Sequence, residues 1–327
     1  MAKPGAWPMR PVAASLLAVC GWLAGSLAGQ AQDWPTRSIR LVVAFSPGGT
    51  ADVLARLLEP YLSAALQQPV IIENRPGSSG TTGSALVAAA APDGHTLLMC
   101  GSGPQITAPL INPKVGYDPV LDFTHIGMVA GDGYLLIANA GQGIRTVAEL
   151  RASGRPALAT ASPGTASLGH LLIEHTRRQT GLDLVHVPYK SSADGIKDLL
   201  GNHISLVMSP VINAGEQVRS GKVAALGLTT AERNPALPEV PTFKEQGFDV
   251  RGLTWFWLCG PKGLPGSVAA RLSSEVRRIV KLPAVKVVLA RDALVTPDLE
   301  RSQVASFVAE EVAQWVPLVK EIGLKMP

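Results

Sequence analysis

Two glycine-rich turns near the start of the chain constrain its fold more than any other feature. The first, Ser46–Asp52, has the sequence Ser-Pro-Gly-Gly-Thr-Ala-Asp, and the second, Gly77–Ser84, has the sequence Gly-Ser-Ser-Gly-Thr-Thr-Gly-Ser. Each follows an apolar run typical of a β-strand, Ile39–Phe45 or Val70–Glu73, and precedes a helical pattern. Such a turn presents backbone N–H groups at the positive end of a helix dipole, where anions bind. We therefore predict one small anionic ligand held between two helix N-termini.

Length and composition indicate an ordered α/β protein with two domains. The 327 residues exceed one average core, and 46% hydrophobic against 17% charged residues excludes a disordered chain. β-type and α-type patterns alternate, which indicates largely parallel sheets. The alternation breaks at Gly101–Gly133, which is irregular in pattern, and restarts at the expected strand Tyr134–Ala138. We expect lobe 1 to comprise residues 32–133 and 253–327 and lobe 2 to comprise residues 134–252, so that two chain crossings form a hinge.

The N-terminal segment, residues 1–31, has the pattern of a secretory signal peptide. Lys3 and Arg10 precede the short apolar run Val12–Leu27, and small residues follow it. This run is shorter than the roughly 20 residues that a membrane span needs. We predict cleavage and export to the periplasm, with a membrane anchor or a lipoprotein attached at Cys20 as the alternatives.

Charge and motifs exclude several classes of function. Cleavage would leave 27 basic and 25 acidic residues, a balance too even for a nucleic-acid binder. The sequence lacks the motifs of serine-hydrolase elbows, P-loops, zinc proteases and dinucleotide-binding folds, so we expect neither an enzyme nor a cofactor. His170 and Glu174 share a helix face, but no third ligand has a spacing suited to a metal. Cys100 and Cys259 allow a disulfide in an oxidising compartment, and buried free thiols are the alternative.

Short motifs spread through nearly the whole mature chain match one family in order and spacing. They are Pro47-Gly48-Gly49-x-x-Asp52, Glu73-Asn74-Arg75-Pro76-Gly77, Pro92-Asp93-Gly94-His95, His186-Val187-Pro188-Tyr189-Lys190, Asp198-Leu199-Leu200-Gly201 and Leu237-Pro238-x-Val240-Pro241-Thr242. On these residues the chain resembles the Bug-type periplasmic solute-binding receptors of tripartite tricarboxylate transporters. The resemblance implies a type II periplasmic binding protein of the Venus flytrap kind. Each of its two lobes would be a central, mostly parallel sheet flanked by helices, and the lobes would close over a carboxylated solute.

The resemblance also implies which residues contact the solute. In this family the two glycine turns of lobe 1 hold a ligand carboxylate, largely through backbone N–H groups and waters. The lobe 2 turn Ser162–His170 and the region Tyr189–Ser191 are implied to contact the rest of the ligand. The candidate ligand-binding residues are Ser46, Gly48, Gly49, Thr50, Asp52, Ser78, Ser79, Gly80, Thr81, Ser162, Gly164, Thr165, Ser167, His170 and Tyr189. For each of them, a purely structural role in capping or packing is the alternative interpretation.

The partners follow from the resemblance rather than from the residues. It implies delivery of the solute to the large and small membrane permease subunits of a tripartite transporter, by a receptor that acts as a monomer. A solute sensor that signals through a regulatory protein is one alternative. A periplasmic hydrolase that uses Ser162 or Thr165 is a weaker one. The sequence leaves open which carboxylate is bound.

Overall fold

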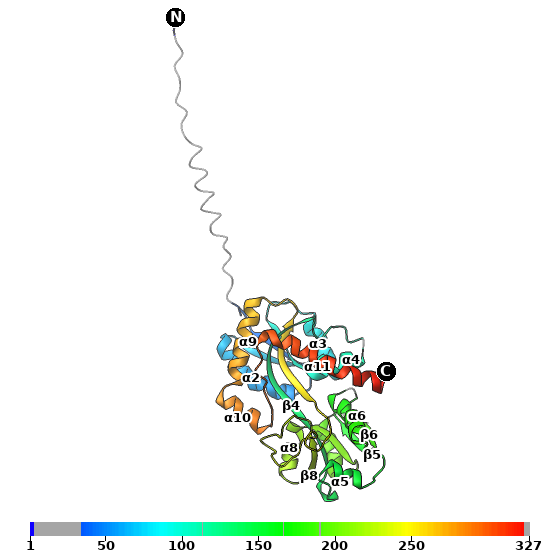
Figure 1. Cartoon of the computed structure of the whole chain (residues 1–327). Coiled ribbons are helices and arrows are strands. Elements are labelled where there is room, and N and C mark those ends of the chain that lie inside the picture. Colours follow the sequence, from blue (N-terminus) through cyan, green and yellow to red (C-terminus); the bar gives the residue numbers. More distant parts are fainter. Residues whose placement is uncertain (3–33, 113, 166, 190, 324–327) are drawn as a thin grey trace.

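The structure is a computed structural model that describes residues 1–2, 34–112, 114–165, 167–189 and 191–323. The expected signal peptide lies almost wholly outside these residues, so its prediction stays a prediction. Figure 1 shows two lobes, one above the other, with long strands running between them. No helix in the described ranges is both long and apolar enough to cross a membrane.

The first lobe is assembled from two separate stretches of chain. The earlier stretch contains β1 (Ile39–Val43), α2 (Thr50–Leu66), β2 (Val70–Asn74), the short 3-10 helix η2 (Ser78–Gly80), α3 (Thr81–Ala88), β3 (Thr96–Gly101), the π-helical turn η3 (Gly103–Thr107) and α4 (Ala108–Ile111). The later stretch contains β9 (Leu253–Pro261), α9 (Gly266–Val280), α10 (Pro283–Arg291) and α11 (Arg301–Ile322). The long strand β4 (Phe123–Asn139) belongs to both lobes.

The second lobe follows β4 without interruption. Its elements are the short 3-10 helix η4 (Ala140–Gln142), α5 (Val147–Ala152), β5 (Leu158–Ser162), α6 (Leu168–Thr180), β6 (Leu184–Pro188), α7 (Ser192–Leu200), β7 (Leu206–Pro210), α8 (Val211–Arg219) and β8 (Val223–Leu228). The start of α5 carries a capping box, in which Thr146 and Glu149 are each bonded to the other's backbone N–H.

The same strand order recurs in both lobes. It is β2-β1-β3-β9-β4 in the first lobe and β6-β5-β7-β4-β8 in the second. In each lobe the fourth strand of this order, β9 or β4, runs antiparallel to both of its neighbours, and the other four strands share one direction. Each sheet is therefore mostly parallel, as the alternation of β-type and α-type patterns predicts.

One expectation from the sequence is wrong. The stretch Gly101–Gly133 is not irregular throughout, because β4 begins at Phe123 and pairs with β9 as far as Gly133. The glycines inside the strand hide it from a propensity argument, since glycine weakens strands. The fold requires one of them: a Cβ atom on Gly131 would lie 2.3 Å from the ring of Trp255. A single strand therefore passes from one lobe into the other.

Two apolar layers cover the first sheet. Successive residues of a strand point to opposite faces, and β1 follows this rule: Leu41 and Val43 pack with α2, α9 and α10, whereas Val42 packs with α3, α4 and α11. Because helices cover both faces, β1 is a continuous apolar run rather than an alternating one. In the second lobe, α6 covers one face and α7 and α8 cover the other.

Helix α11 contacts both lobes. Its residues Val304 and Val308 pack in the first lobe, and Trp315, further along, lies in the same apolar layer as the core of α6. Arg178 of α6 forms an ion pair with Glu321 near the end of α11. Figure 1 shows α11 running along the first lobe toward α6. This helix adds a contact between the lobes beyond the two chain crossings.

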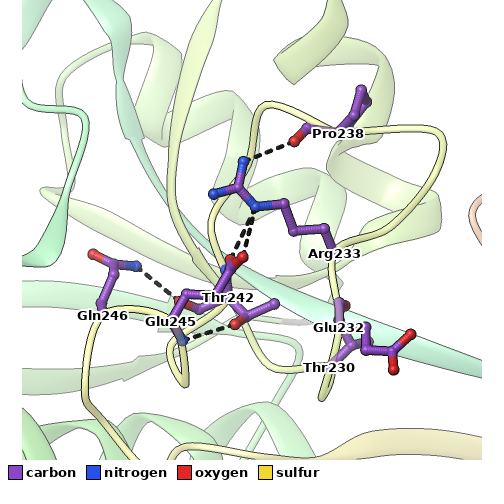
Figure 2. A network of polar contacts seen from close by, with 7 residues as sticks. All are labelled: Thr230, Glu232, Arg233, Pro238, Thr242, Glu245 and Gln246. Carbon is purple, nitrogen blue, oxygen red and sulfur yellow. Dashed lines mark hydrogen bonds and ion pairs between the residues drawn. The ribbon is translucent and has the colours of Figure 1, made fainter.

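A polar network folds the long connection between β8 and β9 (Figure 2). Arg233 Nε donates to both carboxylate oxygens of Glu245 at 2.9 and 3.0 Å, and Arg233 also donates to the carbonyl oxygen of Pro238 at 2.9 Å. The N–H of Thr242 donates to Glu245 at 2.8 Å. The Thr242 N–H and the Arg233 guanidinium together hold the pKa of Glu245 below its ordinary value. The Leu237–Thr242 motif thus has a structural role in this connection.

The two cysteines beyond the signal region are joined. Cys100 of β3 and Cys259 of β9 form a disulfide between neighbouring strands, with their Cα atoms 6.2 Å apart. Of the two alternatives that the sequence leaves open, the structure has the bridge. The disulfide links β3, in the earlier stretch of the first lobe, to β9, in the later stretch.

Candidate functional site

The carboxyl ends of the parallel strands of the two lobes point toward each other. Strands β3 and β4 both run antiparallel to β9, so β1, β2 and β3 run in the direction of β4, and Gly101 at the end of β3 lies level with Ala130. Strands β5, β6 and β7 run the opposite way, and Pro210 at the end of β7 pairs with Tyr134. Ala130 and Tyr134, which mark the two edges, are four residues apart on β4, and this corresponds to about 13 Å at the rise per residue of a strand. In α/β proteins ligands bind outside the carboxyl ends of strands, and here two such edges are opposed.

The first glycine turn follows β1 at this edge. Gly48 has a φ of +83°, a left-handed conformation that favours glycine, and no heavy atom lies within 4 Å of the position of a Cβ. Gly49 is the N-cap of α2, and no side chain caps this helix. Ser46 and Gly48 are exposed, and Gly49 and Thr50 are half-buried. The N–H groups of the first turn of α2 therefore receive no side-chain cap from their N-cap residue.

Asp52 fixes this turn from inside the fold. Its side chain is 3% exposed. Its carboxylate accepts hydrogen bonds from the N–H of Gly48, the amide of Asn74 and the guanidinium of Arg56, each at 2.9 Å. Burial raises the pKa of this carboxyl, but the three donors together hold it below its ordinary value. The amide of Asn74 also donates to the carbonyl oxygen of Phe45 at 3.0 Å. Asp52 and Asn74 thus join the ends of β1 and β2.

The second glycine turn follows β2 at the same edge. Ser78 and Ser79 are exposed residues with φ values of 46° and 56°, and Gly80 has a φ of 89°. Gly80 is the N-cap of α3, again without a capping side chain. Its Cβ position is closed by Pro104 at 3.1 Å and by the ring of Phe45 at 3.2 Å. This turn therefore requires glycine at 80. The N–H of Thr81 donates to the carbonyl oxygen of Ser78, and Gly80 provides no side-chain cap for the N–H groups that follow in α3.

The side chains of Thr81 and of Ser102, which follows β3, are buried and hydrogen-bonded within the first lobe. The Thr81 hydroxyl donates to the carbonyl oxygen of Ser78 at 2.9 Å. After β3, the buried hydroxyl of Ser102 accepts the N–H of Trp255 at 2.8 Å. Sequence reasoning missed Ser102, which lies in the stretch that it assigned as irregular. The hydroxyls of Thr81 and Ser102 therefore stabilise the backbone at the first edge, and we do not assign them to ligand contact.

In the second lobe, Ser162 and two histidines form a packed group. Ser162 is 1% exposed, its hydroxyl donates to the carbonyl oxygen of Gly164 at 3.0 Å, and it lies 2.7 Å from Nε2 of His186. The rings of His170 and His186 stack with centroids 3.6 Å apart. Burial lowers the pKa of both imidazoles, that of His186 to about 4. Both rings are therefore neutral at pH 7. The three side chains pack together beneath Gly164 and Thr165 and stabilise the turn that carries them.

The remaining candidates of the second lobe divide between the turn and its framework. Gly164 is half-buried and Thr165 is exposed. Ser167 is the N-cap of α6 and accepts the N–H of His170 at 3.2 Å. The Tyr189 hydroxyl donates to Asp198 at 2.8 Å, and this bond raises the tyrosine pKa. Tyr189 is thus engaged within its own lobe.

A residue of β4, Asp132, caps the N-terminus of α8, the helix that follows β7. Asp132 is 1% exposed, and its Oδ1 accepts the N–H groups of Val211 and Ile212 at 3.1 and 3.4 Å, at the start of α8. Burial holds the pKa of Asp132 well above its ordinary value. Its Oδ2 is buried and has no hydrogen-bond partner among the described residues. Sequence reasoning missed this residue because it lies inside the strand that the pattern concealed.

The structure therefore sorts the predicted site residues into two groups. Exposed or half-buried on the opposed turns are Ser46, Gly48, Gly49, Thr50, Ser78, Ser79, Gly164, Thr165, Ser167 and Tyr189, whereas Asp52, Gly80, Thr81, Ser162 and His170 are buried. None of them lines the cavity of about 630 Å³ between α6 and α11, which is bordered by His175, Arg178, Arg251, Glu311 and Trp315 among others. That cavity is not formed by the carboxyl ends of the parallel strands, and the helix N-termini that follow those ends do not line it.

Comparison with known proteins agrees with this architecture. The model of the family described as "Tripartite tricarboxylate transporter family receptor" matches residues 54–324. The chain is similar to the solved structure of Rpa4515 with adipate from R. palustris, at 32% identity and a TM-score of 0.82, covering 90% of this chain and 99% of that one. It is also similar to MatC of Rhodopseudomonas palustris with bound malate, at 30% identity and a TM-score of 0.78, covering 88% and 100%.

A third solved structure carries the family name implied by the sequence motifs. It is the periplasmic binding protein BugD, at 30% identity and a TM-score of 0.79, covering 89% of this chain and 99% of that one. The family and these neighbours are solute-binding receptors and not enzymes, which confirms the expectation drawn from the missing catalytic motifs. The chain belongs to the receptor family of tripartite tricarboxylate transporters, with the two-lobed fold of the Bug-type periplasmic binding proteins.

Proposed function

We propose that this protein captures a small carboxylate between its two lobes and delivers it to the membrane permease subunits of a tripartite transporter. The opposed strand ends carry the proposal, because they place the N-termini of α2 and α3, whose N-cap residues are both glycines without a side-chain cap, on one edge. Adipate and malate, the solutes in the solved structures of two relatives, are both small carboxylates. We place the ligand contacts on the exposed turns Ser46–Thr50 and Ser78–Ser79 and on the second-lobe turn at Gly164–Thr165.

The physical basis of capture is preorganisation. Asp52 holds Gly48 in place before any ligand arrives, so the donors of the first turn of α2 need no reordering to bind an anion. A helix N-terminus attracts negative charge through its dipole and its unpaired N–H groups. The turns of the second lobe then close over the solute and exclude water. Closure is stabilised by the difference between the affinities of the closed and open states for the ligand.

We also place the mature protein in the periplasm. The signal-like residues 1–31 and the Cys100–Cys259 bridge support this, because disulfides persist in oxidising compartments. A monomeric receptor that meets the permease through its outer surface is part of the same proposal. Reconstituted uptake tests delivery: solute should enter vesicles that contain the permease subunits only when the receptor is added.

A thermal-shift experiment tests capture. Ligand-stripped protein of residues 32–327 is screened against small carboxylates that include adipate and malate. At 100 times its dissociation constant a ligand adds about 2.7 kcal/mol, which raises Tm by several degrees. Gly48→Val is expected to abolish the shift, since a branched side chain at a positive φ distorts the turn without meeting any neighbour.

Gly221→Val is the matched control. Gly221 also has a positive φ, of 70°, with open space at its Cβ position, but it precedes β8 at the far end of the second lobe. This variant is expected to lose a similar amount of stability and to keep the full ligand shift. Equal shifts in both variants, or no carboxylate that stabilises the wild type, would contradict the proposed function.

A further inference from the structure

We propose that the solute bound here carries a single carboxylate, held by the first lobe, and ends in a non-anionic group that donates hydrogen bonds to the second lobe. This inference rests on the proposed function and narrows its substrate class. Adipate and malate, the solutes of two relatives, are both dicarboxylates. The preference inferred here is therefore a property of this chain's own residues and not of those neighbours.

The first argument is the difference in capping between the two opposed edges. In the first lobe, neither α2 nor α3 has a side-chain hydrogen bond at its N-cap, which is Gly49 in one helix and Gly80 in the other. Up to four N–H groups at such a helix start lack intrahelical partners. Both helices begin directly after turns that follow adjacent parallel strands. The N–H of Thr81 already donates to the carbonyl oxygen of Ser78, and the other N–H groups of these two helix starts receive no side-chain cap from their glycine N-caps.

The second edge has part of its donors already engaged by side chains. The helices α6, α7 and α8 follow the carboxyl ends of β5, β6 and β7, and each is capped by the protein itself. Ser167 accepts an N–H of α6, Ser191 accepts the N–H of Asp194 in α7 at 3.2 Å, and Asp132 accepts two N–H groups of α8. A second ligand carboxylate would have to displace these acceptors or bind only to the N–H groups that they leave over.

The second argument is charge. Asp194 lies exposed in the first turn of α7, where its carboxylate accepts the hydroxyl of Ser191 at 2.8 Å. Asp198 follows in the same helix and accepts the hydroxyl of Tyr189. A ligand carboxylate at this edge would meet the negative charge of Asp194. An amide or hydroxyl group would instead donate to the oxygens of Asp194 that remain open to solvent.

Among the described residues of the first edge, the two arginines that could favour a second negative charge are already paired with carboxylates. Arg56 is paired with Asp52, and Arg75 is paired with Glu73. Both arginines are exposed; Asp52 ends the first glycine turn, and Glu73 lies in β2 just before the second. The charge that this edge can neutralise therefore comes from the helix starts, which suits one carboxylate.

Matched probes of equal length test the proposal. Calorimetry at pH 7.5 on ligand-stripped residues 32–327 compares adipate, adipic acid monoamide and the neutral diamide, and likewise succinate, succinamate and succinamide. Of the two series, we consider the one with the chain length that binds more tightly. In that series the monoamide should bind at least about tenfold more tightly than the dianion, and the diamide should not bind. A dianion that binds as tightly as its monoamide, or more tightly, would overturn the inference while leaving the proposed function intact.

The variant Asp194→Asn removes the charge of this side chain while nearly keeping its shape, and so tests whether the charge sets the preference for the monoamide. Asp194→Asn should strengthen dianion binding about threefold and weaken monoamide binding, because the amide loses its charged acceptor, so the preference for the monoamide narrows. Asp183→Asn is the control: Asp183 accepts the N–H of Ala157 at the opposite ends of β5 and β6, and the preference should persist. An unchanged preference in Asp194→Asn would overturn the role assigned to this carboxylate.

Lys190 lies outside the described residues, and its substitution completes the test. Lys190→Gln should weaken dianion and monoamide equally or not at all. A selective loss of dianion affinity would overturn the inference, because it would reveal a cation that receives a second carboxylate. If no mono- or dicarboxylate of either length, nor any other small carboxylate, binds at all, the proposed function itself fails.

Discussion

Replacement of Asp52 by Asn tests whether the first glycine turn is held in place from inside the fold. The carboxylate accepts the N–H of Gly48, the amide of Asn74 and the guanidinium of Arg56. Asparagine keeps one acceptor oxygen and directs an NH₂ group at one of these donors. A hydrogen bond to a charged group contributes about 1.5–3 kcal/mol, and at least one such bond is lost. We therefore expect the free energy of unfolding to fall by about 2–3 kcal/mol.

Urea unfolding followed by tryptophan fluorescence measures this effect. For a slope of about 3 kcal/mol per M, the midpoint at pH 7 should fall by about 0.7–1 M. Arg56→Ala is the matched control, because it removes only the partner whose side chain is 55% exposed, and it should leave the midpoint nearly unchanged. Asp52→Asn should also weaken carboxylate binding, since the N–H of Gly48 loses its tether.

The pH dependence gives a second signature. The folded pKa of Asp52 lies below its ordinary value of 3.8, so the carboxylate stabilises the fold above that pH. The stabilisation is lost as the pH falls through the folded pKa. The difference between wild type and Asp52→Asn should persist at pH 5 and shrink below pH 3.8. A variant no less stable than Arg56→Ala, or a difference that grows as the pH falls, would refute this reasoning.

Three further predictions concern packing and the disulfide. Gly80→Val should lower Tm far more than Gly48→Val, because its Cβ meets neighbouring side chains at 3.1–3.3 Å whereas that of Gly48 meets none; equal Tm values would contradict the geometry. Gly252→Ala should cost about 1–3 kcal/mol of unfolding free energy, since its Cβ would lie 3.0 Å from side chains of α6 and α11, and an unchanged urea midpoint would count against their close approach. Reduction of Cys100–Cys259 should cost about 2–4 kcal/mol, and non-reducing peptide mapping that finds both thiols free would disprove the bridge.

The alternation of β-type and α-type segments was predictable because each depends on local pattern. The run Ile39–Phe45, the turn Ser46–Asp52 and the helix after it have the periods and turn residues of their structures, and β1 and α2 lie there. The strand Phe123–Gly133 was not predictable in this way. Its glycines exist for contacts with residues far along the chain, such as Trp255 against Gly131. Tertiary packing decided that segment, and local propensity could not reveal it.

The candidate site shows the same division. The glycine turns could be located from the sequence because Gly48 and Gly80 adopt conformations that glycine favours. The sequence could not distinguish a turn residue from the framework beneath it. Asp52 and Ser162 are polar residues in glycine turns, yet both are buried and bonded to neighbours from other elements. Their partners, Asn74 and His186, become neighbours only when parallel strands pair.

The central claim is that a carboxylate binds at the opposed strand ends. A crystal structure of the protein with its solute tests it most directly. The account predicts a carboxylate within hydrogen-bonding distance of N–H groups in the first turns of α2 and α3, with the rest of the solute against Gly164 and Thr165. A solute seated instead in the cavity between α6 and α11, beside Arg178 and Arg251, would contradict it.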